Sequence, residues 1–130
     1  MEITELMIGD IVQYLDGKKL ITVVVVKVDG SGNVVRLKQK NGHKFNTTID
    51  FLRPKPLTDK ILKKNGFEYF HKNYSSLSYD HPFKLKMTNW PDENGLGGLY
   101  TICDIIEIRF VHQLQHAFTL CKINKQISLP

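Results

Sequence analysis

The chain has 130 residues and a mass of 15.0 kDa, the size of one domain or of two very small ones that share a core. Its apolar fraction of 42% and charged fraction of 24% are close to the globular average and argue against wholesale disorder. No apolar stretch reaches the ~18 residues of a membrane span, the start lacks the pattern of a signal peptide, and the two cysteines are expected to stay reduced. These properties predict a soluble cytoplasmic protein with no membrane partner.

The first 55 residues carry the pattern of a small antiparallel β-barrel. Segments rich in β-branched residues alternate with glycine turns, because glycine takes the positive φ that a tight reversal needs. The expected strands are 11–15, 20–28, 34–38 and 43–49, followed by a single closing turn before Pro54. With its Gly-Asp-Ile-Val opening, this order resembles an SH3-like barrel, a fold that binds nucleic acid, peptides or nothing.

Residues 56–130 are expected to form a smaller sheet with two helices. A short docking helix is predicted over 57–66, since Thr58 can cap its start and Gly66 can end it. A C-terminal helix is predicted over 110–121, where apolar residues recur at helical spacing. The strands are expected at 67–70, 74–79, 83–88, 99–108 and 122–129.

The fold class predicted from these elements is α+β. An N-terminal SH3-like antiparallel barrel over 1–55 is followed by an α+β half over 56–130, and we expect the two to pack as one unit. In the C-terminal helix, Val111, Leu114 and Phe118 are expected to face the core together with Cys121, while His112 and Gln113 are expected to be exposed.

The positive charge is concentrated in one part of the sequence. The net charge is +5, and a division after Gly66 leaves 12 basic and 7 acidic residues before it, against 6 of each after it. Between residues 36 and 64, only Asp50 and Asp59 oppose nine basic residues. Clustered positive charge attracts polyanions, although it is also typical of a solvated surface. The nine candidate nucleic-acid-binding residues are Arg36, Lys38, Lys40, Lys44, Arg53, Lys55, Lys60, Lys63 and Lys64.

Three motifs support a resemblance that extends over nearly the whole chain. They are the opening Ile8-Gly9-Asp10 turn, the Pro56-Leu57-Thr58 helix start and the Val111-His112-Gln113-Leu114-Gln115 helix, in that order. In these motifs the chain resembles a group of small uncharacterised proteins of Bacteroides-type bacteria and their phages and mobile elements. The resemblance implies a phage or mobile-element context. It implies no mechanism and no catalytic residue.

The residue patterns favour neither metal binding nor catalysis. His112 and His116 have metal-ligand spacing on a helix, but further ligands would have to come from elsewhere in the fold. Cys103 and Cys121 are expected to be buried and inert thiols. The glycine-rich loop at 94–98 lacks the Lys-Ser/Thr of a phosphate loop. We therefore predict no enzyme activity, no catalytic residue, no metal and no cofactor.

Two binding functions remain open. The first is a phage or mobile-element accessory module that contacts nucleic acid through the basic residues listed above. The alternative is an adaptor or inhibitor that binds a host protein through the aromatic segment 69–90, with Tyr74, Tyr79 and Trp90 as contacts. In this alternative the aromatic rings have to be exposed, whereas the competing interpretation places at least half of them in the core.

Overall fold

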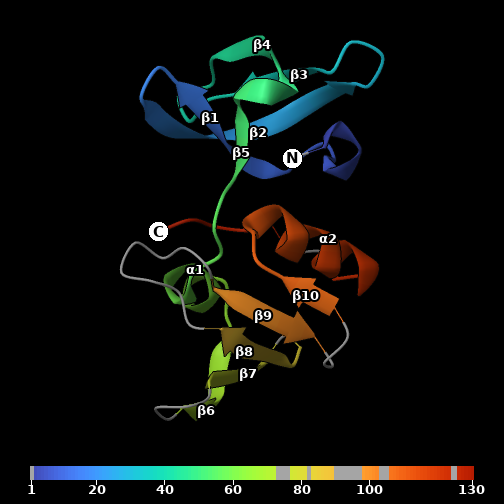
Figure 1. Ribbon diagram of the computed structural model, residues 1–130. Coiled ribbons are helices and arrows are strands. Elements are labelled where there is room, and N and C mark those ends of the chain that lie inside the picture. Colours follow the sequence, from blue (N-terminus) through green and yellow to red (C-terminus); the bar gives the residue numbers. More distant parts are fainter. Residues whose placement is uncertain (1, 73–76, 82, 90–97, 103–105, 124–125) are drawn as a thin grey trace. The chain divides into compact units, whose positions relative to one another are not determined.

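The computed structural model describes residues 2–72, 77–81, 83–89, 98–102, 106–123 and 126–130 (Figure 1). The chain divides into two compact units, unit 1 over Met1–Lys55 and unit 2 over Pro56–Pro130. The described residues form two five-stranded antiparallel sheets, one in each unit. This arrangement confirms the mixed α+β class.

Unit 1 is built on one sheet with the strand order β4-β3-β2-β1-β5. The four predicted strands are confirmed, and so is a turn at Ile49–Phe51, but Leu52–Pro54, expected to belong to that closing turn, form a fifth strand. Within the described residues β4 and β5 are the two edges of this sheet, so its hydrogen bonds do not close it into a barrel. The elements are η1 (Ile3–Glu5), β1 (Ile11–Asp16), β2 (Lys19–Asp29), β3 (Val34–Lys38), β4 (Lys44–Thr48), η2 (Ile49–Phe51) and β5 (Leu52–Pro54).

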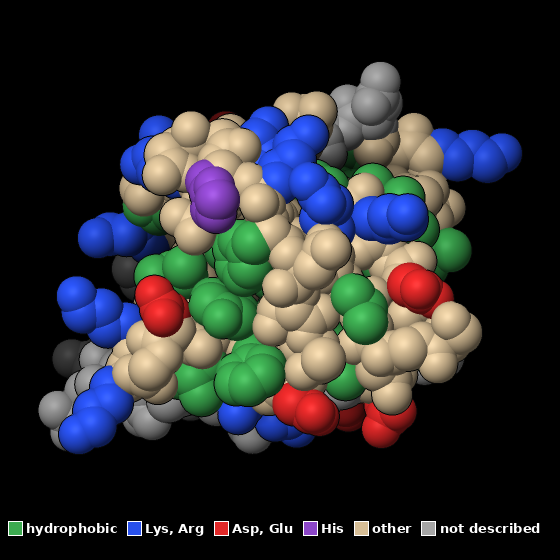
Figure 2. Space-filling view, turned by 90° about the horizontal axis from the view of Figure 1, so that it is seen from above, with side chains coloured by type: hydrophobic (Ala, Val, Ile, Leu, Met, Phe, Trp, Pro, Cys, Tyr) green, Lys and Arg blue, Asp and Glu red, His purple; other side chains and the backbone are tan. Residues whose placement is uncertain are grey.

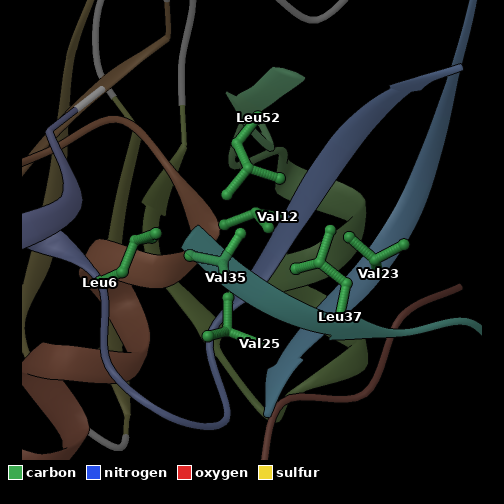
Figure 3. Close-up of a cluster of buried hydrophobic side chains, with 7 residues drawn as sticks. All are labelled: Leu6, Val12, Val23, Val25, Val35, Leu37 and Leu52. Atoms are coloured by element: carbon green, nitrogen blue, oxygen red, sulfur yellow. The ribbon is translucent and has the colours of Figure 1, made fainter. Parts of the chain in front are cut away.

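The core of unit 1 lies on one face of this sheet. Side chains alternate between the two faces of a strand, so in β3 Val35 and Leu37 are buried while Arg36 and Lys38 are exposed. Figure 3 shows the buried cluster, to which β1, β2, β3 and β5 all contribute. Its members are Leu6, Val12, Val23, Val25, Val35, Leu37 and Leu52.

The turn before β1 is joined to the sheet by the Ile-Gly-Asp motif. Asp10 is only 2% exposed, and its carboxylate accepts a hydrogen bond of 2.8 Å from the backbone N–H of Met7. Gly9 has a φ of +97°, which glycine adopts without strain, and its N–H donates to the carbonyl of Val25 at 2.7 Å. The motif therefore has a structural role in starting the sheet.

Replacing Asp10 should destabilise unit 1 through this turn. Asp10→Ala removes the acceptor of the Met7 N–H, and a lost hydrogen bond of this kind costs about 1–3 kcal/mol. Asp10→Asn keeps an oxygen at the same place and should cost less. Urea denaturation of the two variants measures the difference, and equal stability of Asp10→Ala and the parent would show that the carboxylate is dispensable.

Unit 2 contains a sheet with the strand order β10-β9-β8-β7-β6 and two helices. The prediction of one strand over 99–108 is wrong, because β9 and β10 are separate antiparallel strands in which Ile106 pairs with Ile102. No Gly or Pro marks a turn between them, so the sequence alone does not distinguish one apolar strand from two. The elements are α1 (Asp59–Lys64), β6 (Glu68–Lys72), β7 (Leu77–His81), β8 (Leu85–Asn89), β9 (Leu99–Ile102), β10 (Ile106–Ile108) and α2 (Val111–Leu120).

Helix α1 has the predicted residues at its two ends but is shorter than the predicted 57–66, and the residue after it binds the C-terminal tail. The Thr58 hydroxyl accepts from the N–H of Ile61 at 3.3 Å, and Gly66 has a φ of +86°. The buried amide of Asn65 donates to the carbonyl of Ser128 at 2.8 Å and accepts from its N–H at 2.7 Å. The tail is therefore fixed by a side chain, and its described residues do not form the strand predicted over 122–129.

Helix α2 packs on the core of unit 2 with two departures from prediction. Val111, Leu114 and Phe118 are buried as expected. His112 is also buried, at 2% exposed, and its ring stacks on that of Phe110 with centroids 6.0 Å apart. Cys121 is exposed because α2 ends at Leu120, so the thiol lies beyond the last helical turn. The expectations of an exposed His112 and a buried Cys121 are wrong.

Candidate nucleic-acid interface

The outward face of the unit 1 sheet gathers four basic side chains on three neighbouring strands. Lys38 on β3 pairs directly with Lys44 on β4, and Arg36 pairs with Lys27 on β2. Paired residues share one face of a sheet, and all four side chains are exposed. We call Lys27, Arg36, Lys38 and Lys44 the basic face.

The electrostatics of the basic face suit an anionic ligand. Lys38 and Lys44 are like charges at directly opposite positions, an arrangement that disfavours the isolated sheet. Arg36 uses Nη1 for a long bond of 3.5 Å to the neutral Oδ1 of Asn46. A bound polyanion would relieve the repulsion between the two lysines.

Asp29 is an acid close to Lys27, and its hydrogen bonds are made to Ser31. The carboxylate of Asp29, at the end of β2, accepts from the Ser31 hydroxyl at 2.8 Å and from its N–H at 3.1 Å. These two bonds lower the pKa of Asp29, and the charge of Lys27 adds a smaller effect in the same direction. Asp29 therefore stays ionised beside Lys27 and offsets part of its charge, whereas Lys38 and Lys44 lie on β3 and β4.

The other predicted basic residues of unit 1 are arranged differently. Lys40 is exposed in the turn between β3 and β4. Arg53 uses Nη1 to donate to the carbonyls of Asp50 at 2.7 Å and Leu52 at 2.8 Å. The Lys55 ammonium donates to the Thr22 hydroxyl at 3.2 Å, and partial burial lowers its pKa. Arg53 and Lys55 thus already have partners within the protein.

The remaining three predicted residues belong to the other unit. Lys60, Lys63 and Lys64 lie on α1 in unit 2, so the basic run of the sequence is shared between two units. The boundary at Lys55 leaves nine basic and six acidic residues in unit 1, a net charge of +3, and nine and seven in unit 2, a net charge of +2. Dividing the sequence at Gly66 had assigned the whole +5 to the first part, which does not describe the structural units.

Unit 1 also brings together four aromatic rings that the sequence analysis missed. Phe45 lies 4.9 Å from Tyr14, Tyr14 lies 6.3 Å from Phe51, and His43 lies 6.1 Å from Phe45, all between ring centroids. We call these four residues the aromatic row. Figure 2 shows a histidine beside hydrophobic side chains at the surface, bordered by Lys and Arg as well as by Asp and Glu side chains. The only sequence signal was the spacing of His43 and Phe45, two positions apart on one strand face.

The aromatic residues proposed for protein binding do not form a described surface. Tyr74 and Trp90 lie outside the described residues. Tyr79 is buried, its ring lies 6.0 Å from that of Phe67, and its hydroxyl is hydrogen-bonded to Asp59. The placement of Tyr79 among partner contacts is therefore wrong, because its ring is part of the unit 2 core.

The histidine pair is close, but it lacks further ligands among the described residues. The rings of His112 and His116 have centroids 5.6 Å apart. Among the residues that the structure describes, no three His, Cys, Asp or Glu side chains are grouped so that they could hold a metal ion. Cys103 lies outside those residues.

The function is indicated neither by the helices of the described residues nor by comparison with known proteins. In the described part of the chain no helix has the length and apolar character needed to cross a membrane. Function is therefore inferred from the side chains that the fold brings together. No protein-family model, curated protein or solved structure matches the chain.

Proposed function

We propose that this protein is a non-enzymatic accessory module of a phage or mobile element that contacts nucleic acid through the basic face of unit 1. The observation that carries the proposal is the direct pairing of Lys38 with Lys44 beside Arg36 and Lys27 on three adjacent strands. Neighbouring strands lie about 5 Å apart, so the four cations form a compact patch that several phosphates of one ligand can reach.

The topology of unit 1 supports an SH3-like arrangement for this module. The chain runs through β1 to β4 as a meander, makes the single turn η2, and returns as β5 beside β1. Folds of this kind carry many unrelated binding functions. The charge on the outward face, rather than the topology, is the reason for choosing nucleic acid as the ligand.

The expected mode of binding is electrostatic. Each phosphate neutralised by Lys or Arg releases condensed counterions, so the affinity should fall steeply as the salt concentration rises. Lysine ammonium groups contact phosphate without reading base edges, so we expect little sequence preference. The slope of log K against log salt should therefore differ little among oligonucleotides of different sequence. It should differ more among protein variants that change the basic face.

Charge reversal on the basic face tests this function. For Lys38→Glu/Lys44→Glu we expect weaker binding to all oligonucleotides and a slope of log K against log salt that is smaller by about 2, one unit for each lost phosphate contact. Both side chains are exposed, so the fold should be retained. Fluorescence anisotropy over a salt series measures the affinity, and circular dichroism checks the fold.

The matched control is Lys84→Glu/Lys86→Glu, which makes the same change of charge at two exposed positions of unit 2. It should leave the salt slope nearly unchanged. Equal losses in the two double variants would show that only the net charge matters and that the basic face is no interface. Absence of binding by the parent protein at low salt, with single and double strands alike, would contradict the proposed function.

A further inference from the structure

The aromatic row is continuous and comes from three separate elements. Tyr14 lies on β1, Phe45 on β4 and Phe51 on η2, while His43 directly precedes β4. The ring planes of His43 and Phe45 are within 16° of parallel, whereas Tyr14 meets Phe45 at 65°. The fold therefore assembles one run of rings from residues up to 37 positions apart in the sequence.

The row is anchored in the middle and exposed at its ends. Tyr14 and Phe45 are half-buried and pack against the core cluster of unit 1. Phe51 is 47% exposed and His43 is exposed. The two exposed rings extend a packed row and leave ring faces on which a flat ligand can stack.

The positive charges on the other face of β4 favour a polyanion as the occupant of the row. Lys44 lies between His43 and Phe45 in the sequence, and strand alternation places it on the opposite face, where it pairs with Lys38. β4 is an edge strand within the described residues, so a chain that crosses this edge can reach the rings on one side and the lysines on the other. At the other end of the row, Arg53 follows Phe51 by two positions, and its guanidinium donates to the backbone carbonyl of Asp50 at 2.7 Å.

From this arrangement we infer that the aromatic row stacks unpaired bases, so the preferred ligand of unit 1 is single-stranded nucleic acid. The inference rests on the proposed function and specifies its ligand. Aromatic rings stack on any base, which suits a binding mode without sequence preference. In a duplex the base faces are already stacked on one another, so a duplex can use the lysines and not the rings.

The test compares a fluorescent single strand with the duplex of the same sequence, in anisotropy titrations at low salt. Phe51→Ala should weaken single-strand binding by roughly 5- to 150-fold, the range for losing one stacked base, and should leave duplex binding unchanged. Phe51→Tyr keeps the ring and should retain the affinity. The matched control is Leu20→Ala, because Leu20 is similarly exposed, at 50%, and lies outside the row.

The outcomes separate this inference from the proposed function. Equal affinity for single and double strands, or unchanged single-strand binding by both Phe51→Ala and His43→Ala, would overturn the inference and leave the proposed function standing. A third outcome is that Phe51→Ala weakens single-strand binding while Lys38→Glu/Lys44→Glu has no effect. This outcome would support stacking on the aromatic row and contradict binding through the basic face. A lysate protein that stays bound after nuclease treatment, and is lost with Phe51→Ala, would assign the row to a protein partner and overturn the inference.

Discussion

Leu114→Ala and Phe118→Ala should each lower the free energy of unfolding by about 2–5 kcal/mol, through lost burial and the cavity that remains. Both side chains are buried on α2. The ring of Phe118 lies 6.1 Å from that of Phe67 and 5.6 Å from that of Phe83, so its removal breaks a cluster of three aromatic rings. Small domains have a total stability of only ~5–15 kcal/mol, so either change should shift the denaturation midpoint strongly.

Leu120→Ala is the matched control for this prediction. Leu120 ends the same helix but is 76% exposed, so its truncation should change the stability by about 0.5 kcal/mol or less. Urea denaturation followed by circular dichroism compares the three variants. If Leu114→Ala unfolded at the same urea concentration as Leu120→Ala, α2 would not be packed as described.

The start of α2 should tolerate substitution less well than its sequence indicates. Gln113 was expected to be a neutral exposed position, but its side-chain oxygen accepts from the N–H of Arg109 at 2.7 Å and of Phe110 at 3.2 Å. These bonds satisfy backbone donors at the helix start that have no partner within the helix. Neither Gln113 nor the buried His112 is therefore a suitable neutral control.

Leu37→Ala should destabilise unit 1 by a similar amount, about 2–5 kcal/mol, because Leu37 is fully buried in its core. Leu37 also pairs with Phe45 across the two strands, so the cavity would loosen the base of the aromatic row. Hydrogen exchange of the β2 and β3 amides reports on the stability of unit 1 alone. Their protection should fall as the free energy of unfolding of unit 1 falls.

Leu20→Ala provides the comparison in unit 1, because Leu20 is half exposed on β2 and contributes little to the core. It should leave the exchange of the β2 and β3 amides nearly unchanged. Equal exchange rates in Leu37→Ala and the parent would contradict the assignment of Leu37 to the core.

Most elements were determined by patterns within a few neighbouring residues. The alternation of Val35 and Leu37 with Arg36 and Lys38 predicted both the strand and its two faces, because side chains repeat every two residues in a strand. The ends of α1 were predicted from Thr58 and Gly66, whose effects depend only on the backbone of one helical turn.

Pairing between distant segments was decided only by the tertiary structure. The apolar run over 99–108 is compatible with one strand or with a hairpin, and its pairing shows the hairpin β9–β10. The hydrogen bonds between Asn65 and Ser128 join residues 63 positions apart, and neither residue has a local signal for them. Such contacts depend on how whole elements pack, which no short segment encodes.

The candidate site shows the same division. The sequence by itself determined that Arg36 and Lys38 face away from the core. Only the register of β3 with β4 placed Lys44 opposite Lys38, and only the packing of β1, β4 and η2 assembled the aromatic row. A binding face is formed by side chains from several strands, and a shift of one residue in register would turn every side chain of a strand to the other side. The local pattern therefore encodes the faces of each strand, while the packing of the whole unit decides which residues meet on them.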